Sequence, residues 1–120
     1  VNADYTGEDG TRLTRKLLAR TDRPTALVYD NDLMAVAGLG VAREMGVDVP
    51  SQLSLVAWDD SVLCRLVRPS LTAVARDIET TGGMAARMLF AVVEGKTVRG
   101  EESPPGELRP RGSTGPVARP

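Results

Sequence analysis

Two neighbouring carboxylates, Asp59 and Asp60, are the residues in this chain whose types and spacing point most directly to chemistry. They follow a short apolar run, residues 53–58 (LSLVAW), at the point where a buried strand would end and turn toward a helix. A second apolar run, residues 25–29 (TALVY), ends in the polar triplet 30–32 (DND). Ligands of open α/β sheets bind beyond the carboxyl ends of the strands, so these polar residues are candidates for ligand contact.

A structural interpretation of the same residues stays open beside the functional one. Acids and amides directly before a helix often cap it, because the free N–H groups of the first turn need acceptors and the helix dipole favours negative charge. Each pair, Asp59 with Asp60 and Asn31 with Asp32, could therefore contain one capping residue and one ligand-binding residue.

The composition excludes several classes of function. The 120 residues include 42% hydrophobic side chains, enough for one domain with a core, and no apolar stretch reaches the roughly 20 residues that span a bilayer. A formal net charge of -1 gives this chain no surplus of positive charge for nucleic-acid phosphates. A chain without histidine has no histidine-based triad, and Cys64, the single cysteine, suits a reducing cytoplasm. We expect no metal and no cofactor.

The candidate residues must be positioned by helices and strands that alternate along the chain. The alternation is typical of an α/β fold, a parallel sheet flanked by helices and joined by right-handed crossovers. Residues 100–120 are rich in Gly, Pro and charge, so we expect at most an edge strand at Glu107–Arg109 before a disordered tail. Apolar spacing and capping residues predict helices at about 6–20, 33–45, 61–67 and 77–94, and strands at 25–29, 53–58 and 71–74.

Four motifs occur in one order along the chain: residues 31–35 (NDLMA), 49–60 (VPSQLSLVAWDD), 69–74 (PSLTAV) and 111–114 (RGST). Together they resemble the C-terminal region of LacI/GalR-type transcriptional repressors. The resemblance implies a periplasmic-binding-protein-like core of type I, with two α/β lobes and a small effector in the cleft between them. It assigns residues 1–70 to the C-terminal lobe, 71–99 to a crossing segment and helix of the N-terminal lobe, and 100–120 to the edge strand and tail.

The resemblance also implies which residues bind the effector. Tyr5 stands in the loop where the family often places a stacking aromatic ring, Asn31 stands at a ligand-binding amide, and Asp59 matches a carboxylate that accepts hydrogen bonds. Asp60 and Asp32 are then left as the helix caps. A carboxylate, an amide and a ring suit the hydroxyls and the apolar face of a sugar, and a nucleobase would satisfy the same three groups.

The family pairs its C-terminal lobes into homodimers, through the helix after NDLMA and the segment after the paired aspartates. Gly38 and Gly40 fit such pairing, because glycines within a helix cost up to about 1 kcal/mol each and indicate close approach to another element or subunit. The candidate interface residues are Val36, Leu39, Leu63, Leu66 and Val67.

Operator DNA would be bound only through a helix-turn-helix domain that this chain lacks, and no contact with a membrane is expected. The helix at 78–94 would belong to the other lobe, so we expect its apolar stripe to be covered by another copy of the chain or to be poorly ordered.

The leading prediction is therefore the effector-binding and dimerisation fragment of a transcription regulator, and two alternatives stay open. The first is a solute-binding protein that serves a sugar transporter with the same fold. The second is an enzyme that uses Asp30, Asp59 and Asp60 as acid, base or Mg²⁺ ligands. No glycine-rich phosphate loop or basic residue adjoins these acids, which argues against the enzyme.

Overall fold

The computed structural model describes residues 2–116 and divides the chain into two compact units. The first unit comprises the residues up to Ala75 together with those from Leu108 onward, and the second comprises Arg76–Glu107. The resemblance predicted boundaries after residues 70 and 99. In the first unit, residues 72–75 form a strand of the sheet.

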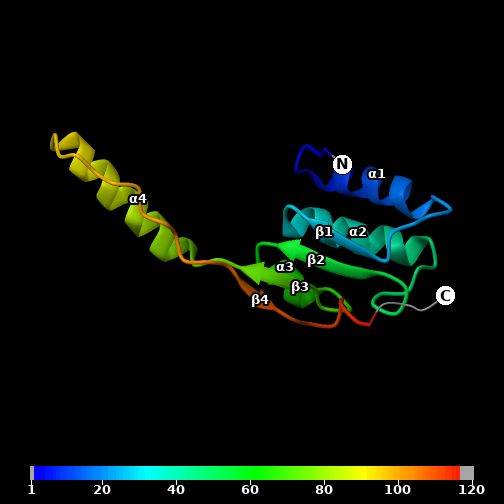
Figure 1. Ribbon diagram of the computed structural model, residues 1–120. Coiled ribbons are helices and arrows are strands. Elements are labelled where there is room, and N and C mark those ends of the chain that lie inside the picture. Colours follow the sequence, from blue (N-terminus) through cyan, green and yellow to red (C-terminus); the bar gives the residue numbers. More distant parts are fainter. Residues whose placement is uncertain (1, 117–120) are drawn as a thin grey trace. The chain divides into compact units, whose positions relative to one another are not determined.

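A sheet of four strands forms the frame of the first unit (Figure 1). The strands are β1 (Ala26–Tyr29), β2 (Ser54–Trp58), β3 (Thr72–Ala75) and β4 (Glu107–Arg109). They are arranged in the order β1-β2-β3-β4, and β2 runs parallel to both β1 and β3. The predicted α/β class with a parallel sheet is confirmed.

Three helices accompany this sheet, and their side chains form the core with one of its faces. They are α1 (Gly7–Leu18), α2 (Asp32–Glu44) and the short α3 (Val62–Leu66). α1 packs along α2, and α2 packs on β1, β2 and α3 (Figure 1). The core includes Ala35 of α2 and Leu55 and Ala57 of β2, all three fully buried.

The opposite face of the sheet is open among the described residues. Successive side chains of a strand point to opposite faces, so Leu55 and Ala57 face the helices while Trp58, adjacent in sequence, faces away. Trp58 is 43% exposed and Val28 of β1 is 69% exposed. The apolar run of β2 predicted a strand buried on both faces; it is buried on one, because the described helices pack on that side.

The two glycines of α2 have different surroundings. A Cβ added to Gly38 would lie 2.0 Å from the hydroxyl of Tyr29, so only glycine allows the helix to lie this close to β1. The predicted close approach is therefore made to Tyr29 of the same chain. Nothing lies within 4 Å of a Cβ at Gly40, whose surface is open.

The C-terminal segment is held on the sheet by Ser113, which is fully buried. Its backbone oxygen accepts from the Leu55 amide (2.8 Å), while its hydroxyl donates to the Leu55 oxygen (2.6 Å) and accepts from the Thr72 amide (2.8 Å). The expected disordered tail after the edge strand is not found at residues 111–115, which bond to the sheet, and the expectation for residues 117–120 lies outside the described residues. Composition misses this segment because hydrogen bonds to β2 and β3, rather than apolar burial, hold it in place.

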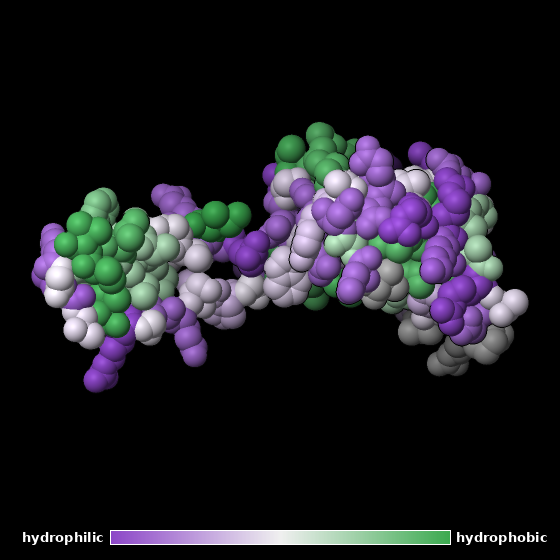
Figure 2. All heavy atoms as spheres, turned by 90° about the horizontal axis from the view of Figure 1, so that it is seen from above, coloured by the Kyte–Doolittle hydropathy of each residue, from purple (hydrophilic) through white to green (hydrophobic). Residues whose placement is uncertain are grey.

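The second unit contains one long helix, α4 (Ile78–Val93), which Asp77 caps by accepting from the Thr80 amide (2.9 Å). None of its residues is buried, and Figure 2 shows the apolar side chains gathered over it. Phe90 is 68% and Val93 is 76% exposed, so the apolar stripe is not packed within its own unit. Within residues 2–116, no helix has both the length and the apolar character that a membrane-crossing segment needs.

Candidate functional site

Asn31 connects the end of β1 with the turn before α1. Its side-chain oxygen accepts from the Met34 amide (2.8 Å) and so caps α2, while its amide nitrogen donates to the Tyr5 oxygen (2.9 Å). The assignment of this cap to Asp32 was therefore wrong, because Asn31 alone precedes the helix in extended conformation. An amide has two donors and two acceptor positions, so Asn31 can make a further bond from each atom.

Tyr5 and Asp59 share an uncommon backbone conformation. Their φ angles are 66° and 76°, in the left-handed region that side chains other than glycine rarely adopt. Residues held in this way cluster at ligand-binding sites, where surrounding contacts keep them in place. The Tyr5 ring is 62% exposed, which leaves its face available for stacking.

Asp60 has a structural role, but it does not cap α3. Ser61 caps this helix by accepting from the Leu63 amide (3.1 Å), which corrects the assignment to Asp60. Asp60 instead accepts a hydrogen bond from the Arg111 guanidinium at 2.6 Å. This bond, with the nearby charges of Arg111 and Arg65, lowers the pKa of the Asp60 carboxyl and keeps it ionised.

Cys64 supports the same turn from within α3. Its sulfur lies 3.6 Å from the Asp59 backbone oxygen, to which the thiol donates. Burial raises the pKa of the thiol, and the negative charges of Asp32 and Asp60 raise it further. A protonated, buried thiol is a packing residue and a weak donor rather than a nucleophile.

The edge formed by the ends of β1 and β2 therefore carries the three candidate ligand residues. Tyr5 and Asn31 are joined by a hydrogen bond, and Asp59 follows β2, the neighbour of β1. Such an edge can accept and donate hydrogen bonds to adjacent hydroxyls and cover one apolar face. Among residues 2–116 no three acidic, Cys or His side chains are grouped so that they could hold a metal ion.

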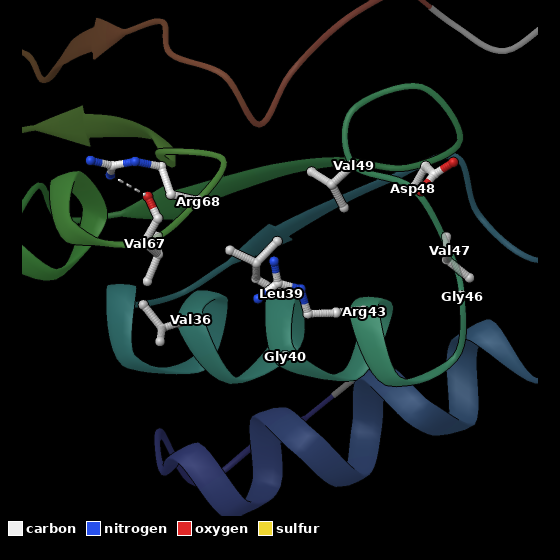
Figure 3. Close-up of a pocket in the computed structure, with 10 residues that line it drawn as sticks. All are labelled: Val36, Leu39, Gly40, Arg43, Gly46, Val47, Asp48, Val49, Val67 and Arg68. Carbon is white, nitrogen blue, oxygen red and sulfur yellow. Dashed lines mark hydrogen bonds between the residues drawn. The ribbon is translucent and has the colours of Figure 1, made fainter.

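A hollow of about 400 Å³ lies away from this polar edge, between α2, the end of α3 and the loop that leads into β2 (Figure 3). Tyr5, Asn31 and Asp59 do not line it. Figure 3 shows three of the five predicted interface residues among those that line the hollow. Val36 and Leu39 belong to α2, and Val67 directly follows α3. The lining residues are Val36, Leu39, Gly40, Arg43, Gly46, Val47, Asp48, Val49, Val67 and Arg68.

The predicted interface residues differ in how much surface they offer. Leu66 is 67% and Leu63 is 37% exposed, and Val36 and Val67 are half-buried. Leu39 is only 9% exposed and belongs to the core, so it forms the floor of the hollow and offers little area to a partner. Val62, 55% exposed on α3, was not predicted but extends the same apolar surface.

The roles of Arg111, which bonds to Asp60, and of Ser113, which bonds to β2 and β3, were not predicted. Both lie in the RGST motif, but sequence alone does not tell which of 15 basic residues meets Asp60. A buried carboxylate requires a cation or several donors, and that requirement is the signal that points to a partner.

Comparison with known proteins places these features in a family. Residues 1–114 match the model of the periplasmic binding protein-like domain. Catabolite control protein A of Priestia megaterium is 34% identical over 98 residues, which are 82% of this chain and 30% of that protein. The chain therefore spans about a third of the length of its curated relatives.

Solved structures give the same result. A LacI family transcriptional regulator from Bifidobacterium animalis subsp. lactis matches with a TM-score of 0.92 and 43% identity, over 98% of this chain and 44% of that one. The regulator CelR in complex with cellobiose matches with a TM-score of 0.81 and 31% identity, over 92% and 34%. The lac repressor dimer bound to operator and the anti-inducer ONPF matches with a TM-score of 0.84 and 28% identity, over 97% and 40%.

Proposed function

Because the chain belongs to the periplasmic binding protein-like domain family, within the LacI type of transcriptional regulators, we propose that it binds the effector and mediates dimerisation in such a regulator. The observation that carries the proposal is the polar edge at the ends of β1 and β2. There Asn31 is bonded to the Tyr5 backbone, and Asp59 follows the adjacent strand in a left-handed turn.

The effector that suits this edge is a sugar. Asp59 supplies a carboxylate that accepts from hydroxyls, Asn31 supplies a donor and an acceptor, and the Tyr5 ring covers an apolar ring face. CelR, a relative of known structure, was solved in complex with cellobiose, which supports a carbohydrate as the ligand class. A nucleobase would use the same donors and acceptors and is the second ligand class to test.

In the mechanism we propose, the two lobes of the regulator have two relative arrangements, and the effector binds one of them more tightly than the other. In this proposal the first unit is the C-terminal lobe, and α4 belongs to the other lobe, whose remaining residues would cover its apolar stripe. An effector that binds one arrangement more tightly shifts the population toward it. The change in lobe orientation would reach operator DNA through a separate DNA-binding domain of the cytoplasmic, full-length protein.

Dimerisation would use the surface of α2 and α3. Leu66, Leu63 and Val62 form an exposed apolar group on α3, and the open surface at Gly40 continues it on α2. The lac repressor, a structural relative, was solved as a dimer bound to operator. The relatives described above are regulators, which favours this function over a transporter's solute-binding protein and over an enzyme.

A thermal-shift screen of the full-length protein tests the effector site. The panel contains glucose, galactose, cellobiose and adenine. A ligand at 100 times its Kd stabilises the folded state by about 2.7 kcal/mol, so a binder raises the Tm by several degrees. We expect one panel member to do so, and Asp59→Ala to abolish its effect.

Asp48→Ala is the matched control, because Asp48 is an exposed carboxylate that lines the hollow rather than the polar edge. It should leave the ligand-induced shift unchanged. A shift that survives Asp59→Ala, or a panel without any binder, would contradict the proposal.

A further inference from the structure

Asp59 has a left-handed backbone conformation (φ 76°), which aspartate adopts more often than most residues other than glycine. A residue other than glycine in this region costs of order 1–3 kcal/mol unless its surroundings hold it. The following residues supply those contacts: Cys64 bonds to the Asp59 oxygen (3.6 Å), and the Asp60 side chain is anchored by Arg111 (2.6 Å). The conformation of the candidate ligand carboxylate thus depends on its neighbour.

Arg111 is held against β3 by hydrogen bonds from its side chain and its backbone. One guanidinium nitrogen donates to the Leu71 oxygen (2.7 Å) and the other to the Asp60 carboxylate (2.6 Å). Its backbone amide donates to the Thr72 hydroxyl (2.9 Å). The Asp60 and Arg111 side chains are only 12% and 18% exposed, so solvent screens this pair little.

Two other arginines, Arg65 and Arg109, lie near Asp60 but attract it more weakly than Arg111 does. Arg65 approaches the other Asp60 oxygen only to 3.6 Å, and its side chain is 54% exposed. That Asp60 oxygen is buried and has no hydrogen-bond partner in this part of the chain. A half-satisfied buried carboxylate is held by its one strong bond, so loss of Arg111 would release Asp60 from its position.

We propose that Arg111 is a positioning residue for the effector site: through Asp60 it fixes the turn that presents the Asp59 carboxylate, without touching the ligand. This inference rests on the proposed function. Arg111 also lies just after the point where the chain re-enters the first unit at Leu108. A change at this re-entry would therefore reach Asp59 through the ion pair of Arg111 with Asp60.

The test uses the full-length protein and four variants. Arg111→Met removes the charge and keeps most of the length, Arg111→Lys keeps the charge but loses the two-pronged geometry, and Asp60→Asn removes the other partner. Arg99→Met is the control, because Arg99 is an exposed arginine of the second unit. Two quantities are measured: amide hydrogen exchange of residues 58–64, and the Kd for the panel member that stabilises the wild type.

We expect Arg111→Met and Asp60→Asn to raise exchange at 58–64 by about tenfold, with exchange of β1 and α2 unchanged. The Kd should rise about tenfold in both, less in Arg111→Lys, and not at all in Arg99→Met. The double variant Asp60→Asn with Arg111→Met should bind no more weakly than the worse single variant, because both act through one contact.

The possible failures are distinguishable. If Asp59→Ala abolishes binding while Arg111→Met leaves the Kd unchanged, the positioning role is overturned and the effector site stands. If Arg111→Met raises hydrogen exchange throughout the first unit, Arg111 stabilises the whole unit rather than the turn at Asp59. That result would also overturn the inference. If no panel member binds the wild type, or Asp59→Ala leaves binding unchanged, the proposed function fails and the positioning role fails with it.

Discussion

At the scale of single residues, the polar edge shows how neighbouring side chains of similar chemistry divide their tasks. Sequence identified both pairs, Asp59 with Asp60 and Asn31 with Asp32, but it assigned the caps incorrectly. A cap is decided by which residue is extended and which oxygen reaches the N–H groups of the first turn. Those are backbone properties that residue type does not specify, and Ser61 and Asn31 meet them.

The ion pair of Asp60 predicts a pH dependence of stability. Its carboxyl pKa is lowered in the folded state, mainly by the hydrogen bond from Arg111, with Arg65 and Arg109 adding weaker attraction. The stabilisation is therefore complete above the ordinary carboxyl pKa of 3.8 and is lost as the pH falls through the lowered value. We expect Asp60→Asn to reduce the free energy of unfolding by about 1.5–3 kcal/mol at neutral pH.

Urea unfolding of wild type and Asp60→Asn at several pH values measures this contribution. The difference in unfolding free energy should be constant between about pH 5 and 7 and should shrink below about pH 4. Two pH profiles that stay parallel down to strongly acidic pH would show that the pair does not stabilise the fold.

At the scale of elements, the alternation of strands and helices could be predicted from apolar spacing and capping residues. Thr6 caps α1 and Asp77 caps α4, at the starts of two of the predicted helices. The packing of the C-terminal segment on the sheet could not be predicted. It depends on hydrogen bonds that Ser113 makes with β2 and β3, two strands that are distant from Ser113 in the sequence. Local pattern carries no information about such partners.

Substitution of the two glycines of α2 separates packing within the chain from packing between chains. Gly38→Ala places a methyl group against the Tyr29 ring and should destabilise the fold by about 1–3 kcal/mol. Gly40→Ala meets nothing within 4 Å, so it should stabilise the helix by up to about 1 kcal/mol in a monomer. Thermal unfolding of both variants checks these signs, and equal effects of the two would contradict the described packing.

At the scale of the whole molecule, two apolar surfaces are exposed for different reasons in this account. The surface of α2 and α3 would pair with a second copy, whereas the stripe of α4 would pack in the other lobe. Composition predicted a core of one domain, but it did not predict that Val28 and Trp58, on the sheet face away from the described helices, would be exposed.

Dimerisation through α3 is tested by Leu66→Glu in the full-length protein. Leu66 is 67% exposed at the proposed interface, and a buried charge there should raise the dimer dissociation constant by at least about 30-fold. Leu108→Glu is the control, since Leu108 is also exposed (54%) but lies on β4. Sedimentation equilibrium measures both variants, and an unchanged dimer in Leu66→Glu would exclude this surface.

The most direct test of the effector site is an NMR titration of this chain, labelled with ¹⁵N, using the panel member that produces the largest thermal shift. We predict that the amide signals of Tyr5, Asn31 and Asp59 move with ligand concentration, and that those of the residues lining the hollow stay in place. Changes confined to Gly40, Arg43 and Asp48 would instead place the ligand in the hollow and contradict the proposed site.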